Sequence, residues 1–296
     1  MITTPPGSVH LFRPPYRLLE PLLDVGRLAP ATGTSGAALV WTMPERRSEA
    51  QFQAIRYRPP GVSLLTILPP AARVADKDDV LRMIEFCRPT AVLPYHEEAY
   101  TDDLRVLLSA PPEDLPASVI DFLRWRGLAL DLDLRRLLRR VVELSGEIRS
   151  VNALARGVYL SRRALGRRFT NNGLPVPSHW LHISRLLRAT LRIQGSDEPV
   201  AHIARSLGYP DAFALSNQMK RLVGVRPSEV RGRLGWEWVI ETWLRKEARE
   251  GGFSDDLANT LLPTSAVAQG RADQPLDPVG KVPVVRSDGA KSKQKG

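Results

Sequence analysis

Basic side chains gather in one part of this 296-residue chain. Residues 135–234 hold 19 Lys and Arg against 6 Asp and Glu, an excess of 13 positive charges. The stretches before and after it carry net charges of −3 and 0, so this basic block sets the net charge of +10. Guanidinium groups bind phosphate oxygens through paired, charge-assisted hydrogen bonds. A block this basic is typical of a protein that binds nucleic acid, or less often of one that binds an anionic membrane surface.

Two segments of the basic block share the pattern of a short helix, a turn and a second helix. In the first segment, residues 151–173, we expect the turn at Gly157 and a second helix capped by the Ser161 side chain. Leu165 and Phe169 are four residues apart, so they share the buried face of that helix. The other directions of the helix hold four arginines, Arg162, Arg163, Arg167 and Arg168.

The second segment, residues 200–224, repeats this pattern. Its turn is expected at Gly208, its second helix starts near Asp211, and Gly224 ends that helix. Two such hairpins also occur in ordinary helical bundles. However, two of them in one basic block, joined by an amphipathic helix over 180–193, favour a pair of helix-turn-helix motifs.

The second segment and its continuation, IARSLGYPDAFALSNQMKRLVGVRPSEVR, resemble the signature of the AraC/XylS-type transcription regulators. The matching residues are Ile203, Ala204, Gly208, Tyr209, Asp211, Ser216, Lys220, Arg221, Gly224, Pro227 and Arg231. The departures are Leu215 and Met219 in place of Phe, Asn217 in place of Arg, and Val230 in place of an aromatic residue. The resemblance covers residues 135–234 and does not extend to the N-terminal region, where many members carry a cupin-type barrel.

This resemblance implies a sequence-specific transcription regulator that reads the major groove of double-stranded DNA with two helix-turn-helix motifs. It assigns base reading to Arg162, Arg163, Gly166 and Arg167 in the first motif and to Ala212, Phe213 and Asn217 in the second. Arginine pairs with guanine, asparagine pairs with adenine, and phenylalanine or alanine contacts a thymine methyl group. The residues expected to bind phosphates are Arg168, Lys220, Arg221, Arg226 and Arg231.

Competing interpretations accompany these assignments. Phe213 could instead be buried against its own domain, and the arginines of the first motif could contact phosphates or only water. The alternative for the whole chain is a small-molecule sensor or a scaffold whose basic domain binds nucleic acid without strong sequence specificity.

The N-terminal region has a different hydropathy pattern, with short apolar runs at 37–43, 61–68 and 91–95. Their centres are 25 and 27 residues apart, which is the length of a repeating strand–helix unit with parallel strands. Residues 78–87 read as one of the intervening helices. We therefore predict an α/β domain, receiver- or flavodoxin-like and degenerate, followed by an all-α domain with two helix-turn-helix motifs. The rival interpretation makes residues 51–58 a strand in a mixed sheet.

These patterns predict four parts of the chain. They are an N-terminal extension (1–36), an α/β regulatory domain (37–130), an AraC-type double helix-turn-helix DNA-binding domain (131–249) and a disordered tail (250–296). The tail is predicted because the apolar periodicity is lost and Pro, Gly and Ala dominate.

Sequence motifs for catalysis are missing. The chain has five His and one Cys, and neither HExxH nor a phosphate-binding glycine loop occurs. We therefore expect no enzyme, no catalytic residue, no metal site and no cofactor. The start of the chain lacks the features of a secretion signal, and no apolar run approaches the ~20 residues of a membrane span. The expectation is a cytoplasmic protein that binds double-stranded DNA and no membrane, with a homodimer partner or RNA polymerase as candidate protein partners.

Overall fold

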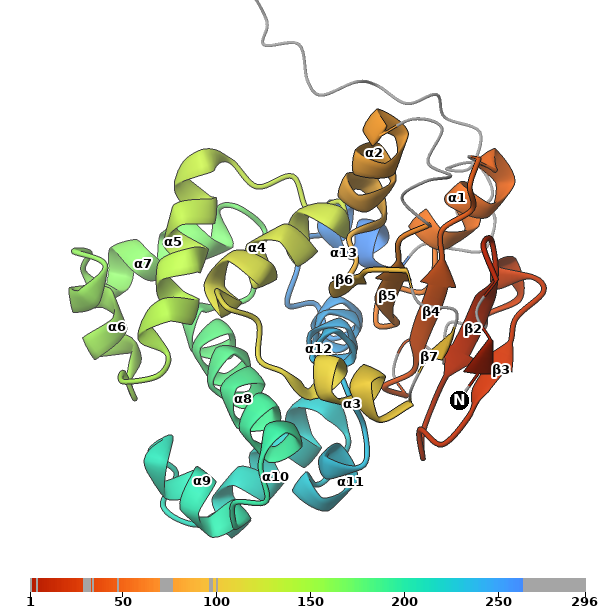
Figure 1. Ribbon diagram of the computed structural model, residues 1–296. Helices are drawn as coiled ribbons and strands as arrows, with labels where there is room; N and C mark the ends of the chain where they lie inside the picture. The colour runs from red at the N-terminus through yellow and green to blue at the C-terminus, as the bar shows by residue number, and fades with distance from the viewer. Residues whose placement is uncertain are drawn as a thin grey trace, which may run out of the picture. The chain divides into compact units, whose positions relative to one another are not determined.

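A computed structural model describes residues 2–3, 5–28, 33, 35–46, 48–69, 77–95, 98–99 and 101–262 (Figure 1). The elements of the N-terminal region are β1 (Ile2–Thr3), β2 (Val9–Phe12), β3 (Leu19–Pro21), the short 3-10 helix η1 (Val25–Arg27), β4 (Ala38–Thr42), α1 (Glu49–Arg56), β5 (Ser63–Ile67), α2 (Lys77–Cys87), β6 (Ala91–Leu93), β7 (Glu98–Ala99), α3 (Thr101–Ser109) and α4 (Leu115–Trp125). The remaining elements are helical: α5 (Leu132–Leu144), α6 (Val151–Gly157), α7 (Arg162–Thr170), α8 (Pro177–Gly195), α9 (Val200–Ser206), α10 (Ala212–Val223), α11 (Pro227–Arg231), α12 (Glu237–Arg249) and α13 (Asp255–Leu261). The predicted α/β region followed by an all-α region with two helix-turn-helix motifs is confirmed.

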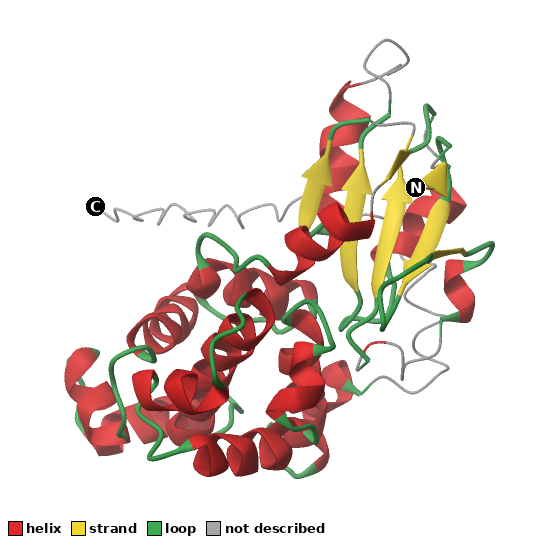
Figure 2. Ribbon diagram, turned by 60° about the horizontal axis from the view of Figure 1, so that its bottom comes forward, coloured by secondary structure: helices red, strands yellow, loops and turns green. Residues whose placement is uncertain are grey.

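The three predicted strands form the parallel part of a five-stranded sheet with the order β3-β2-β4-β5-β6 (Figure 2). Val40 of β4 pairs with Leu65 of β5, and Leu65 pairs with Ala91 of β6. Both crossovers step across the sheet in the same direction, so their right-handedness places α1 and α2 on one face. The alternative strand over residues 51–58 is wrong, because α1 forms there and buries Phe52 and Ile55.

The expected N-terminal extension, residues 1–36, contributes two strands to this sheet. Strands β2 and β3 form an antiparallel hairpin, and β2 also pairs antiparallel with β4. The order of the five strands is that of a flavodoxin-like sheet. The first two strands run antiparallel, however, so a short hairpin replaces the crossover helix that parallel strands would need.

Both faces of the sheet are covered by apolar side chains. Trp41 on one face packs with Phe52 of α1 and Met83 of α2. Val40 on the other face packs with Leu104 of α3 and with Leu234, which follows α11 in the basic block. The sheet therefore shares part of its core with the helical region.

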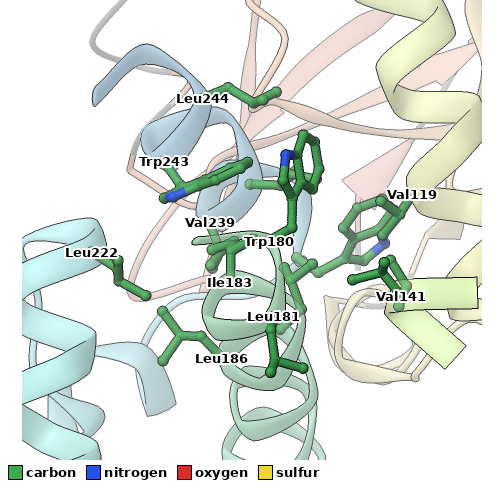
Figure 3. Packing of buried hydrophobic residues seen from close by; sticks show 14 of the residues in the cluster. Val119, Val141, Trp180, Leu181, Ile183, Leu186, Leu222, Val239, Trp243 and Leu244 are labelled. Carbon is green, nitrogen blue, oxygen red and sulfur yellow. The ribbon is translucent and has the colours of Figure 1, made fainter. Parts of the chain in front are cut away.

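Helix α8 forms the centre of the helical region and is buried along most of its length (Figure 3). The Trp180 ring of α8 contacts the Trp243 ring of α12 edge-on, with centroids 4.8 Å apart. Val141 of α5 and Leu222 of α10 belong to the same core cluster. One apolar core thus joins the two helix-turn-helix motifs to α12.

Buried ion pairs and hydrogen bonds tie α12 to the N-terminal region. The Glu237 carboxylate accepts hydrogen bonds from the Ser63 hydroxyl at 2.9 Å and the Thr90 hydroxyl at 3.1 Å. The Glu241 carboxylate accepts two hydrogen bonds from Arg126, at 2.7 and 3.1 Å. Through these contacts the described residues up to 262 belong to one compact unit.

The first residues of the predicted disordered tail are ordered in the structure. Residues 255–261 form helix α13, and Phe253 and Leu261 are buried in the helical core. Leu261 also provides a backbone carbonyl that accepts a hydrogen bond from Arg126 at 2.9 Å. The disordered tail predicted from residue 250 is therefore wrong for this part, and residues 263–296 lie outside the described residues.

Ending the chain after residue 251 rather than after residue 262 should lower the free energy of unfolding by about 3–6 kcal/mol. This is the contribution expected from fully burying one Phe and one Leu side chain. Urea denaturation of the two truncated proteins measures the difference directly. Equal midpoints and slopes would show that α13 does not stabilise the fold.

Candidate nucleic-acid interface

The first helix-turn-helix motif consists of α6 and α7. The Ser161 hydroxyl caps α7 by accepting the Ala164 N–H at 3.1 Å, as predicted, and Leu165 and Phe169 are fully buried. The turn differs from the prediction, because Gly157 is still the last residue of α6. The left-handed residue of the turn is Tyr159, with φ of 57° and a side chain that is 95% exposed.

The second motif consists of α9 and α10. The Asp211 carboxylate caps α10 by accepting the Ala214 N–H at 2.7 Å. Gly208 has φ of 73°, so the turn needs glycine for its conformation. Gly224 ends α10 with φ of 79°, as the sequence predicts.

The side chains assigned to base reading lie on the outer faces of α7 and α10. Arg162, Arg163 and Arg167 are exposed, and Gly166 is half-buried between them. On α10, Asn217 is exposed, Ala212 is half-buried and Phe213 is 72% exposed. Burial of Phe213 against its own domain, the competing interpretation, is therefore wrong.

Two arginines of α8 hold neighbouring elements against it, one the second motif and the other the end of α5. Arg185 donates a hydrogen bond to the Leu207 carbonyl of the second motif at 2.8 Å and lies over the Tyr209 ring. Arg188 donates to the Ser145 hydroxyl at 3.0 Å and to the Val142 carbonyl at 2.9 Å, at the end of α5. Burial lowers the pKa of both guanidinium groups from the ordinary arginine value. These two arginines of the basic block are structural.

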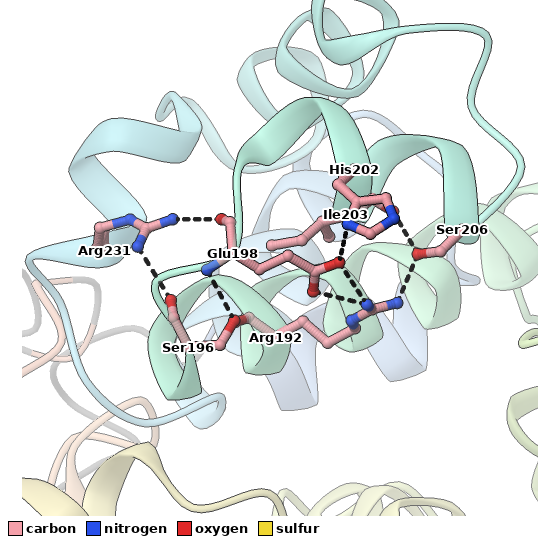
Figure 4. Close-up of polar contacts among 7 residues, drawn as sticks. All are labelled: Arg192, Ser196, Glu198, His202, Ile203, Ser206 and Arg231. Carbon is pink, nitrogen blue, oxygen red and sulfur yellow. Dashed lines mark hydrogen bonds and ion pairs between the residues drawn. The ribbon is translucent and has the colours of Figure 1, made fainter.

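A polar network fixes the second motif to the C-terminal end of α8 (Figure 4). The Glu198 carboxylate accepts hydrogen bonds from Arg192 at 2.6 and 2.9 Å and pairs with the His202 ring at 3.0 Å. Arg231 donates to the backbone carbonyls of Ser196 and Glu198, each at 2.9 Å. The guanidinium of Arg231, predicted to bind phosphate, thus connects α11 to the loop between α8 and α9.

Other arginines of the basic block are paired with acids on or beside α5. Arg139 pairs with Asp114, Arg140 with Glu143 at 2.8 Å, and Arg136 with Asp133 at 3.7 Å. Arg168, predicted to bind phosphate, also pairs with Asp133, at 3.4 Å. Much of the positive charge that the sequence shows is therefore compensated within the fold.

Seven basic side chains of the block have no hydrogen bond or ion pair with another described residue. They are Arg156, Arg162, Arg163, Arg167, Lys220, Arg221 and Arg226. The first six lie on the two motifs, and every one of the seven except Arg156 is among the predicted DNA contacts. Arg156 of α6 was missed, because the sequence alone does not distinguish it from the arginines that form pairs. Arg226, the remaining predicted phosphate contact, is exposed at the start of α11.

The two caps show which positions of the motifs correspond. Aligning Ser161 with Asp211 places Arg163 opposite Phe213 and Arg167 opposite Asn217. Arg163 and Arg167 are four residues apart on α7, so they project from one face of that helix. Phe213 and Asn217 have the same spacing on α10 and share a face of that helix. A helix with its side chains is about 10–12 Å wide, and the major groove of B-DNA is about 12 Å wide.

The described part of the chain contains neither a cluster of metal ligands nor a helix that could cross a membrane. No group of three or more His, Cys, Asp or Glu among those residues is placed to bind a metal ion. No helix among them is long and apolar enough to cross a membrane.

Comparisons with known proteins point to the same region. The helix-turn-helix domain family matches residues 154–233, from within α6 to just beyond α11. The HTH-type transcriptional activator RhaS of Escherichia fergusonii is 32% identical over 101 residues, which are 34% of this chain and 36% of that relative. The chain therefore covers about a third of the length of the curated relative it matches. No solved structure matches the chain. The two motifs and the helix between them form an AraC/XylS-type helix-turn-helix domain.

Proposed function

We propose that this protein is a transcription regulator that binds specific sequences of double-stranded DNA with α7 and α10 in the major groove. The observation that carries the proposal is the position of the unpaired cations of the basic block, because six of the seven lie on the two motifs. Other arginines of the block are paired with acids or held in place by backbone carbonyls, whereas the side chains of these six are free to turn toward a polyanion. RNA polymerase or a second copy of the chain completes the proposed set of partners, in the cytoplasm. The proposal assigns the chain no catalytic reaction.

The length of α8 supports binding by both motifs of a single chain. Its 19 residues span about 28 Å at 1.5 Å per residue. Successive major-groove segments on one face of B-DNA are ~34 Å apart. The reading helices lie on either side of α8, so a modest DNA bend accommodates the difference. We therefore expect one chain to protect about two helical turns of a non-palindromic site.

In this proposal the two helices have different tasks. Arg162, Arg163 and Arg167 of α7 read guanine, with Gly166 allowing the helix to approach the base edges. Ala212, Phe213 and Asn217 of α10 form the second reading face. Arg168, Lys220, Arg221 and Arg226 bind phosphates, to which we add Arg156. Arg231 contributes by holding the second motif in place.

Arg167→Ala tests base reading. A bidentate arginine–guanine pair contributes about 1–3 kcal/mol of discrimination, so the variant should lose preference at one position of the site. The measurement is competition between a selected duplex and duplexes with single base changes. Arg136→Ala is a matched control, because Arg136 is an exposed arginine of α5 that pairs with Asp133.

The control variant should keep the preference of the unchanged protein at every position. If Arg167→Ala weakens binding equally on all duplexes, Arg167 contacts phosphate. If the unchanged protein binds all duplexes equally, the alternative of nucleic-acid binding without strong specificity replaces the proposal.

A further inference from the structure

Phe213 is a large apolar side chain exposed at the start of a reading helix. Its exposed fraction is 72%, whereas Leu215 and Met219 of the same helix are fully buried. The Asp211 cap fixes the start of α10, so Phe213 occupies the second position of the helix. The N-terminal residues of a recognition helix are the ones that reach base edges.

The outer face of α10 changes in character along the helix. Phe213 and Asn217 lie near its start, and Lys220 and Arg221 follow on the same face at seven and eight residues from Phe213. The cationic end can contact phosphates, which directs the apolar end toward the bases. The equivalent position of α7 holds Arg163, so the two helices present opposite chemistry at corresponding places.

We propose that Phe213 makes the second motif a reader of the pyrimidine 5-methyl group. This inference rests on the proposed function and specifies what α10 recognises. In the major groove the C5-methyl of thymine is the apolar feature of a base-pair edge. A phenyl ring offers no hydrogen bond to a base edge, so it distinguishes bases by burying this methyl group. Methylation of cytosine at C5 adds the same group at the same place, so 5-methylcytosine should be recognised as well.

The test compares four pyrimidines at one position. A bound site is first selected from random duplexes with the whole protein, and each thymine in it is replaced in turn by deoxyuridine. At one or two positions in one half of the site, uracil should weaken binding about fourfold, the effect of burying one methyl-sized group. At the same positions, 5-methylcytosine should bind about fourfold more tightly than cytosine.

Variants assign the effect to Phe213. Phe213→Ala should bind thymine and uracil equally at those positions, and thermal unfolding should be unchanged because the side chain is exposed. Phe213→Leu should retain most of the methyl preference. Arg163→Ala should weaken binding overall and leave the thymine-to-uracil ratio unchanged.

Each opposing result has a distinct meaning. If selection with the unchanged protein enriches no duplex sequence, the proposed function itself is overturned. If the protein binds a specific site but its affinity is the same with uracil and with thymine at every position, only the methyl inference is overturned. A Phe213→Ala variant that still prefers thymine to uracil also overturns it, because another group then contacts the methyl.

Discussion

Raising the salt concentration from about 50 to about 200 mM should lower the affinity for duplex DNA about 500-fold. Each phosphate that a cation neutralises releases condensed counterions, and the proposal assigns five cations to phosphates, Arg156, Arg168, Lys220, Arg221 and Arg226. Five such contacts give a slope of about −4.5 in a plot of log affinity against log salt concentration. Fluorescence anisotropy with a labelled duplex at several salt concentrations measures this slope.

Paired and unpaired cations should affect the slope differently. Replacing both Lys220 and Arg221 with alanine should make the slope shallower by about 2. Replacing both Arg139 and Arg140 with alanine removes the same charge from α5, where both side chains pair with acids, and should leave the slope unchanged. A slope near zero for the unchanged protein would rule out an interface dominated by phosphate contacts.

Arg126→Ala should lower the free energy of unfolding by about 3–5 kcal/mol, the usual cost of removing one partner of a buried ion pair. Arg126 and Glu241 are almost completely buried, and the guanidinium also donates to the Leu261 carbonyl. The substitution leaves Glu241 with Arg245 alone, at 2.9 Å, and leaves the carbonyl without this donor. Urea denaturation followed by tryptophan fluorescence measures the loss.

Two further variants separate the ion pair from general effects of arginine removal. Arg139→Ala breaks a pair whose side chains are about half exposed, and it should cost no more than about 1 kcal/mol. Arg126→Met combined with Glu241→Met should recover much of the loss, because both charges are then absent from the core. If Arg126→Ala costs no more than Arg139→Ala, the buried pair does not contribute to stability.

The sequence predicts those elements that have strong apolar patterns. β4, β5 and β6 are continuous apolar runs, and their regular spacing also predicts that they are parallel. Strands β2 and β3 were missed because they have only four and three residues, too few for an alternating pattern. Their pairing depends on β4, which is distant in sequence. Helix α13 was missed for a similar reason, since its few apolar side chains gain their burial from α12.

The candidate site is predictable at the level of helices and caps. Ser161, Asp211 and Gly224 act as expected because capping is a local interaction. The partners of individual arginines are not local. Arg231 and Arg168 were predicted to bind phosphate, yet the fold brings each of them to polar groups distant in sequence, the Ser196 and Glu198 carbonyls and the Asp133 carboxylate. The left-handed turn at Tyr159 was also unexpected, because such a conformation favours glycine.

Helix α12 determines how the DNA-binding part can be excised for study. The family match ends at residue 233, four residues before α12 begins. A fragment that stops there would expose the side of α8 on which Trp180 meets Trp243, and would remove the Lys246 ammonium from the Arg221 carbonyl of α10. A fragment that keeps α12 but lacks the N-terminal region would leave Glu237 without Ser63 and Thr90, and Glu241 without Arg126. The limits of the family match are thus poor boundaries for an expressed fragment, and we expect a stable fragment to include the sheet.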